Sequence, residues 1–255
     1  MTLYQTWKSH TLPKNYQKNW DDWDQWCKKH SIDHVLLDDK ELRDLVAKHY
    51  PQYLDFYDYQ ITENIERVDF SRLVMMALGG VYADLDTYPS KTNDPIVFVK
   101  SGKIVLGSEP KEHTLELYLR DRVLCNAFMI SPSTTSSKNF WEKVMEHVVK
   151  NYEGSFRPVE NTGPMALTRF YEMHPEAFPS SLVTITGACE FFPMVADGQI
   201  SKECPGLDKS YVVHEWTNSW SPKFWKSAMW NNKRHWMYIL LIFLGILFLM
   251  IAARM

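Results

Sequence analysis

Residues 69–86 read Asp-Phe-Ser-Arg-Leu-Val-Met-Met-Ala-Leu-Gly-Gly-Val-Tyr-Ala-Asp-Leu-Asp, and this stretch decides the fold. The residues before the glycines are typical of a buried helix. Gly79 and Gly80 permit the left-handed backbone in which helices often end. A short strand is then expected to lead to Asp84 and Asp86, whose side chains point the same way in an extended chain. The stretch therefore predicts a helix, a glycine stop, a strand and two carboxylates aimed at one spot.

Two carboxylates at one spot suggest a hard cation with oxygen ligands, such as Mg²⁺ or Mn²⁺, and such a cation can hold a diphosphate. A solvated acidic turn is the alternative interpretation of Asp84 and Asp86. Asp69 and Arg72 are three residues apart, so they share one face of the predicted helix. From spacing alone, this pair is either an intrahelical ion pair or part of the same site.

The rest of the chain alternates predicted strands and helices, which indicates an α/β fold with a largely parallel sheet and helices on both faces. Ligands of such sheets bind beyond the carboxyl ends of the strands, where Asp84 and Asp86 are expected. Thr62 is the expected cap of the helix that carries Asp69. Strands are expected at residues 3–6, 34–37, 81–83, 96–99, 104–106, 127–130, 183–185 and 211–213, and helices at 15–30, 40–49, 137–151 and 164–173.

Residues 236–253 carry no charge and are long enough to cross a bilayer as a helix. Trp236 and Tyr238 stand where an interfacial aromatic belt is expected. A buried core helix is the alternative, but the run is apolar on every face. The predicted organisation is a catalytic domain at 1–222, a juxtamembrane segment at 223–235 and a transmembrane helix at 236–253.

The orientation in the membrane is left open by the sequence. Met1 stands almost directly before the first expected strand, so no N-terminal signal peptide is expected. Lys233, Arg234 and His235 precede the apolar run, which slightly favours a cytosolic catalytic domain. The lumen of the Golgi or endoplasmic reticulum is the alternative.

Composition narrows the class of function. A formal net charge of −3 argues against a general nucleic-acid surface. Ten Trp and thirteen Tyr are many for 255 residues, and aromatic rings often pack on sugars, although core packing explains many such residues equally well. The four cysteines are widely spaced without a C-x-x-C pair, so a zinc site is not expected. Free buried thiols are the default expectation, with a disulfide left open.

The pattern D-x-x-R followed by G-G-x-Y-x-D-x-D resembles the sugar-binding region with a DXD motif in family 32 glycosyltransferases. That family includes yeast-type α-mannosyltransferases and enzymes that mannosylate inositol phosphoceramide. The resemblance extends over roughly residues 3–222. Further segments match in order: residues 3–8 (Leu-Tyr-Gln-Thr-Trp-Lys), 125–129 (Cys-Asn-Ala-Phe-Met), 162–164 (Thr-Gly-Pro), 214–216 (His-Glu-Trp) and 219–220 (Ser-Trp).

The resemblance implies a Rossmann-like domain of the GT-A type and assigns roles to its residues. Asp86 is the expected direct ligand of Mn²⁺ or Mg²⁺, and Asp84 is expected to reach the ribose, the donor sugar and the metal's water shell. Asp69 and Arg72 are expected to hold the sugar hydroxyls and the phosphate side. His214 is expected to complete the metal site. Further donor contacts are expected from Thr6, Trp7, Tyr82, Asn126, Gly163, Pro164, Ser219 and Trp220.

By resemblance, the chain is expected to be a metal-dependent, retaining glycosyltransferase. It would move a hexose, expected to be mannose, from a nucleotide sugar to a membrane-associated glycan or glycolipid. GDP-mannose is the expected donor, with UDP-sugars left open, and no nucleic-acid partner is expected. The alternatives are a nucleotide-sugar hydrolase and an inactive, membrane-tethered sugar-binding module.

Overall fold

The structure is a computed structural model that describes residues 1–154 and 158–217. The predicted juxtamembrane segment at 223–235 and the predicted span at 236–253 both lie outside the described residues. Among those that are described, no helix is long and apolar enough to cross a membrane.

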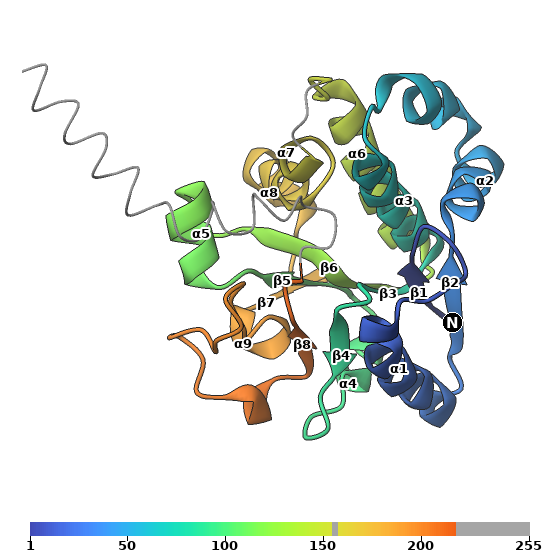
Figure 1. Ribbon diagram of the computed structural model, residues 1–255. Helices are drawn as coiled ribbons and strands as arrows, with labels where there is room; N and C mark the ends of the chain where they lie inside the picture. The colour runs from blue at the N-terminus through green and yellow to red at the C-terminus, as the bar shows by residue number, and fades with distance from the viewer. Residues whose placement is uncertain (155–157, 218–255) are drawn as a thin grey trace, which may run out of the picture. The chain divides into compact units, whose positions relative to one another are not determined.

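A six-stranded sheet forms the centre of the described chain (Figure 1). Strand β6 is antiparallel to both of its neighbours, whereas the other neighbouring pairs are parallel. The expectation of a largely parallel sheet is therefore only partly right: the fold is α/β, but the sheet is mixed. In spatial order the strands are β2 (Asp33–Leu37), β1 (Thr2–Thr6), β3 (Gly80–Ala83), β6 (Leu124–Ser131), β5 (Ile104–Ser108) and β7 (Val183–Thr186).

Helices cover both faces of this sheet, and each face has its own apolar core (Figure 1). The core on one face is built with α2 (Asp39–His49), α3 (Asn64–Leu78), α6 (Thr135–Lys150) and α8 (Pro164–Met173). The core on the other face is built with α1 (Gln17–His30), α4 (Ile96–Val99) and α9 (Ala188–Phe191). The remaining helical elements are α5 (Lys111–Tyr118), α7 (Pro158–Asn161), a π-helical turn at Phe56–Gln60, and 3-10 turns at Lys14–Tyr16, Pro51–Tyr53, Pro175–Ala177 and Leu207–Lys209.

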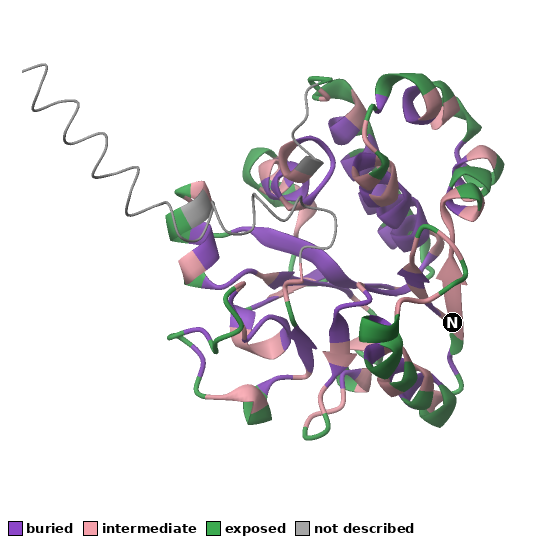
Figure 2. Cartoon of the chain, viewed as in Figure 1, coloured by how far each residue is buried: buried purple, intermediate pink, exposed green. Residues whose placement is uncertain are grey.

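The predicted helix, glycine stop and strand form as expected. Helix α3 is buried along most of its length (Figure 2). It ends at Gly79, whose φ is +88°, and Gly80 follows with φ +138°. A Cβ atom on Gly80 would lie 2.4 Å from the carbonyl oxygen of Thr2. The second glycine therefore lets β3 approach β1 closely enough to pair with it.

Two expectations about local structure are wrong: the strand at residues 96–99 and the cap of α3. Residues 96–99 form helix α4 instead of a strand: the Asp94 carboxylate accepts a hydrogen bond from the Ile96 amide at 3.1 Å, which starts a turn despite the β-branched residues that follow. Thr62 is not the cap of α3. That helix begins at Asn64, and its N-cap residue, Glu63, makes no side-chain capping hydrogen bond.

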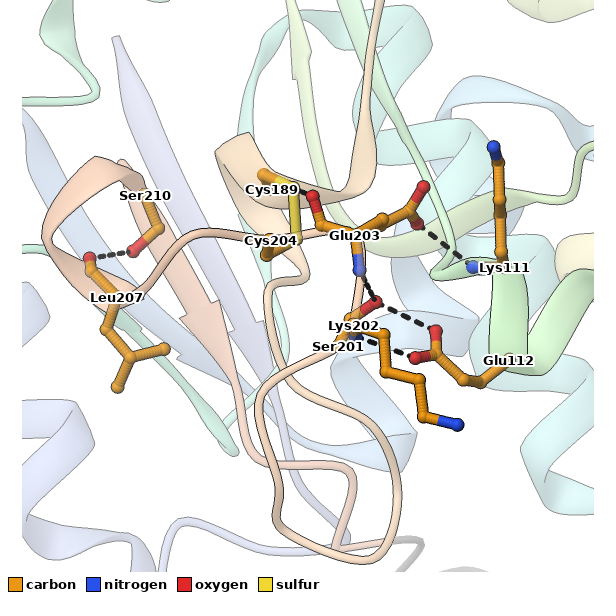
Figure 3. The surroundings of a disulfide bond; sticks show 9 residues. All are labelled: Lys111, Glu112, Cys189, Ser201, Lys202, Glu203, Cys204, Leu207 and Ser210. Carbon is orange, nitrogen blue, oxygen red and sulfur yellow. Dashed lines mark hydrogen bonds between the residues drawn. A yellow bond between two sulfur atoms is a disulfide. The ribbon is translucent and has the colours of Figure 1, made fainter.

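The default expectation of free cysteines is wrong for one pair. Cys189 of α9 and Cys204 form a disulfide, whereas Cys27 and Cys125 are buried free thiols (Figure 3). The loop that carries Cys204 is also hydrogen-bonded to Glu112 of α5. The Glu112 carboxylate accepts hydrogen bonds from the Ser201 hydroxyl and the Lys202 amide, both at 2.8 Å. This pairing depends on tertiary contacts that cysteine spacing does not reveal.

Candidate metal and donor site

The two carboxylates of the D-x-D pattern lie on a turn and not on the strand itself. Strand β3 ends at Ala83, and the Thr87 amide and hydroxyl both donate to the Asp84 carbonyl, at 3.0 and 2.7 Å. The expected strand alternation therefore stops before Asp84. The carboxylates still converge, because β4 (Thr87–Pro89) leaves the turn at once and pairs with β8 (Val212–His214).

Residues from the N-terminal part of the chain form hydrogen bonds to this turn. Asn19 of α1 donates to the Leu85 carbonyl at 3.2 Å and to the Glu215 carboxylate at 3.0 Å. Gln5 of β1 donates to the Asp84 carbonyl at 3.2 Å. Spacing alone did not single out Asn19, since its contacts join segments far apart in sequence. Gln5 belongs to the matched segment at 3–8, which is the one signal that pointed to it.

Asp84, Asp86 and His214 come together at this turn. Each offers one ligand atom, and these atoms all lie within 4.8 Å of one another. The β4–β8 register sets Thr87 opposite His214, and the Glu215 amide donates to the Asp86 carbonyl at 2.8 Å. The imidazole Nε2 of His214 lies 3.2 Å from Asp86 Oδ1. The three residues that sequence reasoning named for the metal are thus gathered by one strand pair.

The chemistry of this donor set fits a divalent cation. His214 Nδ1 is buried and has no hydrogen-bond partner in the described part of the chain. Burial alone would lower the pKa of His214, but the Asp86 charge and hydrogen bond outweigh it and raise that pKa. Burial also raises the pKa of Asp84, against the opposing effect of Arg72. Two carboxylates and a neutral imidazole suit Mn²⁺ better than Mg²⁺.

Arg72 is buried between the two acidic residues it was predicted to act with. Its Nη1 lies 3.0 Å from Asp69 Oδ1, its Nη2 donates to Asp84 Oδ1 at 2.7 Å, and its guanidinium lies 4.7 Å from the Tyr82 ring centre. Burial raises the pKa of Asp69 to about 6. The Asp69–Arg72 pair is therefore not a solvated surface pair: it links α3 directly to the D-x-D turn.

Tyr82 and Thr6 extend this network to β1. The Tyr82 hydroxyl donates to Asp84 Oδ1 at 2.6 Å and lies 3.2 Å from the Thr6 hydroxyl. Both Tyr82 and Arg72 thus bind the same oxygen of Asp84, and no described residue donates a hydrogen bond to its Oδ2. The arrangement fixes the rotation of the Asp84 carboxylate.

Asn126 and the segment at 162–164 gather around Asp69. The Asn126 amide donates to Asp69 Oδ1 at 2.8 Å, and the Thr162 hydroxyl donates to Oδ2 at 3.5 Å. Gly163 and Pro164 follow at the start of α8. Asn126 and the residue before Gly163 therefore both contact Asp69 of α3.

Of the remaining expected donor contacts, Trp7 is described and packs elsewhere. Trp7 is half-buried and packs edge-on against Tyr16, with ring centres 5.6 Å apart. Ser219 and Trp220 lie outside the described residues.

A second group that could hold a metal, His10 with Asp38 and Glu41, is more exposed. Its carboxylates form the capping box of α2, which explains their proximity without an ion.

Residues 5–101 match the family described as glycosyltransferase sugar-binding region containing DXD motif. This region of the chain is similar to that family. It includes Asp69, Arg72, Asp84 and Asp86, whereas Asn126, the segment at 162–164 and His214 lie beyond it.

The chain is similar to curated mannosyltransferases of yeasts. It is 33% identical over 99 residues to inositol phosphoceramide mannosyltransferase 3 of Schizosaccharomyces pombe, a match that covers 37% of this chain and 26% of that protein. Identity is 22% over 191 residues to inositol phosphoceramide mannosyltransferase 2 of the same yeast, covering 70% and 48%. It is 34% over 99 residues to the initiation-specific alpha-1,6-mannosyltransferase of Candida albicans, covering 36% and 25%. The chain thus spans between a quarter and a half of each relative's length.

Among solved structures, the chain is similar to a glycosyltransferase involved in the glycosylation of the major capsid of PBCV-1. The TM-score is 0.45 with 11% sequence identity, and the match covers 89% of this chain and 98% of that one.

Proposed function

We propose that this protein is a metal-dependent, retaining glycosyltransferase with a GT-A-type domain that transfers a hexose from a nucleotide sugar. The observation that carries the proposal is the convergence of Asp84, Asp86 and His214 beside a buried Arg72. The family match over residues 5–101 supports the same reaction class. Mannose is the proposed hexose because the curated relatives are named as mannosyltransferases.

Some residues of the site would bind the cation, and others would orient the donor. Asp86 and His214 would hold Mn²⁺ or Mg²⁺, with Asp84 at its edge. When bound, the cation offsets the negative charge that builds on the leaving diphosphate. Arg72 keeps the Asp84 carboxylate in place, and two opposite charges 4 Å apart are worth about 4 kcal/mol at an effective dielectric of 20. Asp69 and Asn126 would orient the hydroxyls of the sugar.

We further propose a membrane-associated glycan or glycolipid as acceptor, with residues 236–253 as the anchor. Truncation near Lys226 tests this. The shortened protein should keep donor binding, should no longer sediment with membranes, and should work poorly on acceptor embedded in liposomes. Sedimentation equal to that of the full chain would show that the anchor lies elsewhere. Undiminished transfer to liposomal glycolipid would instead favour a soluble acceptor.

The disulfide changes the preferred location of the domain. Disulfides persist in oxidising compartments and are rare in the reducing cytosol. The Cys189–Cys204 bond therefore favours the lumenal alternative over the cytosolic orientation that the basic residues before the apolar run suggest. A protease-protection assay on sealed membrane vesicles distinguishes the two, since a lumenal domain survives until detergent is added.

The test of the proposed function is a thermal-shift and transfer screen against GDP-mannose and UDP-sugars, with and without Mn²⁺. Asp86→Ala should abolish metal-dependent donor binding and transfer while the melting temperature in the absence of metal stays near that of the wild type. Asp44→Asn, which changes an exposed carboxylate on α2, is the control. Full turnover in excess EDTA would refute the metal dependence. Release of free sugar at the same rate with and without acceptor would identify a hydrolase instead.

A further inference from the structure

Trp216 has a backbone conformation that its residue type disfavours. Its φ is +54°, and the other two non-glycine residues with positive φ in the described chain, Ser31 and Leu119, are C-caps of helices. Trp216 instead follows strand β8. The left-handed conformation costs an L-residue about 1–2 kcal/mol, so other contacts must hold Trp216 in place.

The Trp216 side chain is held by a hydrogen bond and by ring contacts. Its indole Nε1 donates to the Met194 carbonyl at 2.7 Å. The His113 ring meets it edge-on, with centres 4.4 Å apart at an interplanar angle of 86°. Met194 is itself fixed by a bridge to Ile200, within the loop that the disulfide closes. The indole is therefore hydrogen-bonded to a loop that a β-bridge and a disulfide both constrain.

The face of this indole packs against His214, one of the candidate metal ligands. The ring centres are 4.1 Å apart and the planes are inclined by 36°. Phe192 lies farther away, with its ring centre 5.8 Å from that of His214. The imidazole is thus in contact with the Trp216 ring and lies near the Phe192 ring.

His214 lacks the support that usually orients a metal-binding histidine. Such residues almost always donate a hydrogen bond from the second ring nitrogen to a carbonyl, a carboxylate or water, which fixes the ring plane. Here Nδ1 is buried and has no hydrogen-bond partner among the described residues. Besides the contact of Nε2 with Asp86, ring packing is what sets the imidazole plane, and Trp216 makes the closer ring contact.

We propose that Trp216 is a positioning residue that holds the His214 imidazole with Nε2 directed at the Asp84–Asp86 carboxylates, in place of the usual hydrogen bond. The left-handed backbone is what turns the indole back onto His214, only two residues earlier in the chain. The inference rests on the proposed function, because it assumes that the three residues bind a divalent cation.

The test measures Mn²⁺ affinity of the full chain in detergent without any donor, from the electron paramagnetic resonance signal of free Mn²⁺. Trp216→Ala should weaken Mn²⁺ binding by about 10- to 100-fold, the loss seen when partners that orient metal ligands are removed. Trp216→Phe keeps an aromatic face and should stay within about threefold of the wild type. In a His214→Ala background, Trp216→Ala should have no further effect on affinity, since the residue it orients is gone.

The control for a general loss of packing is Trp26→Ala. Trp26 is a buried tryptophan whose Nε1, like that of the half-buried Trp216, donates a 2.7 Å hydrogen bond, here to Asp94. No contact with the three candidate ligands is recorded for it among the described residues. It should lower the melting temperature without changing Mn²⁺ affinity. If Trp216→Ala does not fold, Trp216→Leu replaces it, because leucine retains bulk but has no ring plane.

The outcomes separate this inference from the proposed function. Wild-type Mn²⁺ affinity in Trp216→Ala or Trp216→Leu, together with weakened binding in His214→Ala, would overturn the positioning role and leave the metal site standing. An equal loss of affinity in the presence and absence of His214 would also overturn it, because Trp216 would then act by another route. Unchanged binding in both Asp86→Ala and His214→Ala would refute the metal site itself.

Discussion

The acidic groups of the site outnumber the basic ones. The Arg72 guanidinium contacts Asp69 and Asp84, and Asp86 lies next to Asp84 and His214. Breaking a buried charge pair on one side costs more than the pair itself contributes, because the remaining charge is left without compensation. Burial keeps the pKa of Asp84 raised even with Arg72 in place. This excess of buried negative charge is the physical reason to expect a divalent cation.

Arg72→Lys tests whether the fork of the guanidinium matters beyond its charge. A lysine keeps one positive charge but cannot contact Asp69 and Asp84 in the same geometry. We expect kcat/KM to fall roughly 10²-fold, as for the loss of one charged transition-state contact. Steady-state kinetics with saturating Mn²⁺ provide the measurement.

Arg43→Lys is the matched control for that substitution. Arg43 forms a bidentate ion pair with Asp58, with Nε–Oδ1 at 2.9 Å and Nη2–Oδ2 at 2.7 Å, but on the exposed surface of α2. Its conversion should leave the kinetics unchanged. Equal kinetics for Arg72→Lys and the wild type would mean that Arg72 only supports packing.

At the scale of elements, the site depends on the connection from helix α3 to strand β3 and on the pairing of β4 with β8. Helix α3, Gly79–Gly80 and β3 bring Arg72 and Asp84 together, and the β4–β8 pair adds Asp86 and His214. The helices and most strands follow from apolar periodicity, with small shifts at their ends. The prediction of a strand at residues 96–99 is wrong, because four apolar, β-prone residues do not reveal the hydrogen bond from the Ile96 amide to the Asp94 carboxylate at the start of α4.

Gly80→Ala tests the close approach of β3 to β1. A methyl group there would meet the Thr2 carbonyl at 2.4 Å, and the residue would also keep a φ of +138°. Backbone strain of about 1–2 kcal/mol and crowding of about 1–3 kcal/mol should together lower the free energy of unfolding by about 3 kcal/mol. Urea denaturation followed by circular dichroism measures this change.

Gly102→Ala separates strain from crowding in that experiment. Gly102 has φ +67° and nothing within 4 Å of the added Cβ, so only the strain of about 1–2 kcal/mol should appear. If both variants lose the same stability, the close contact between the strands does not limit residue 80.

Replacing both Cys189 and Cys204 by serine tests the link that holds the loop before β8. The two cysteines are 15 residues apart, and closing a loop of that length contributes about 3 kcal/mol in the chain-entropy account. The double variant should unfold at a lower urea concentration than the wild type. Thiol titration of the unfolded wild type should find only Cys27 and Cys125 before reduction. Detection of all four thiols without reductant would contradict the disulfide.

For the described molecule as a whole, stability rests on two cores, one on each face of the sheet. The edge strand β2 contains a titratable residue, His34, whose side chain packs against its neighbours. His34 stacks on Trp20 with ring centres 3.7 Å apart, and its Nε2 lies 2.9 Å from the Gln5 side-chain oxygen. Burial lowers the pKa of His34 to about 4, although Asp24 opposes this effect.

This depressed pKa predicts an acid-side loss of stability. The unfolded chain binds a proton at His34 near its ordinary pKa of about 6.5, whereas the folded chain does not bind it until about pH 4. The stabilising contribution is therefore complete above pH 6.5 and is lost progressively as the pH falls toward 4. The melting temperature should drop over this range, and His34→Phe, which keeps the ring stacking, should drop less. Parallel curves for the two proteins would exclude His34 as the cause.

Sequence alone determined the local features that depend on neighbouring residues. The apolar run with Gly79 and Gly80 dictates a helix stop and a tight strand start, because few other residues tolerate those backbone angles. The D-x-D spacing with D-x-x-R was enough to name Asp84, Asp86 and Arg72, and the same resemblance named His214.

The tertiary structure decided what depends on contacts between distant segments. It alone buries Arg72 between Asp69 and Asp84, sets β6 antiparallel to its neighbours, and joins Cys189 to Cys204. It also gives Trp216 a left-handed backbone and sets its ring centre 4.1 Å from that of His214, and neither feature can be read from the sequence motif. The physical reason is that burial, charge compensation and ring packing depend on which segments of the chain come into contact. The periodicity of residue types, by contrast, predicts only the local conformation of each segment.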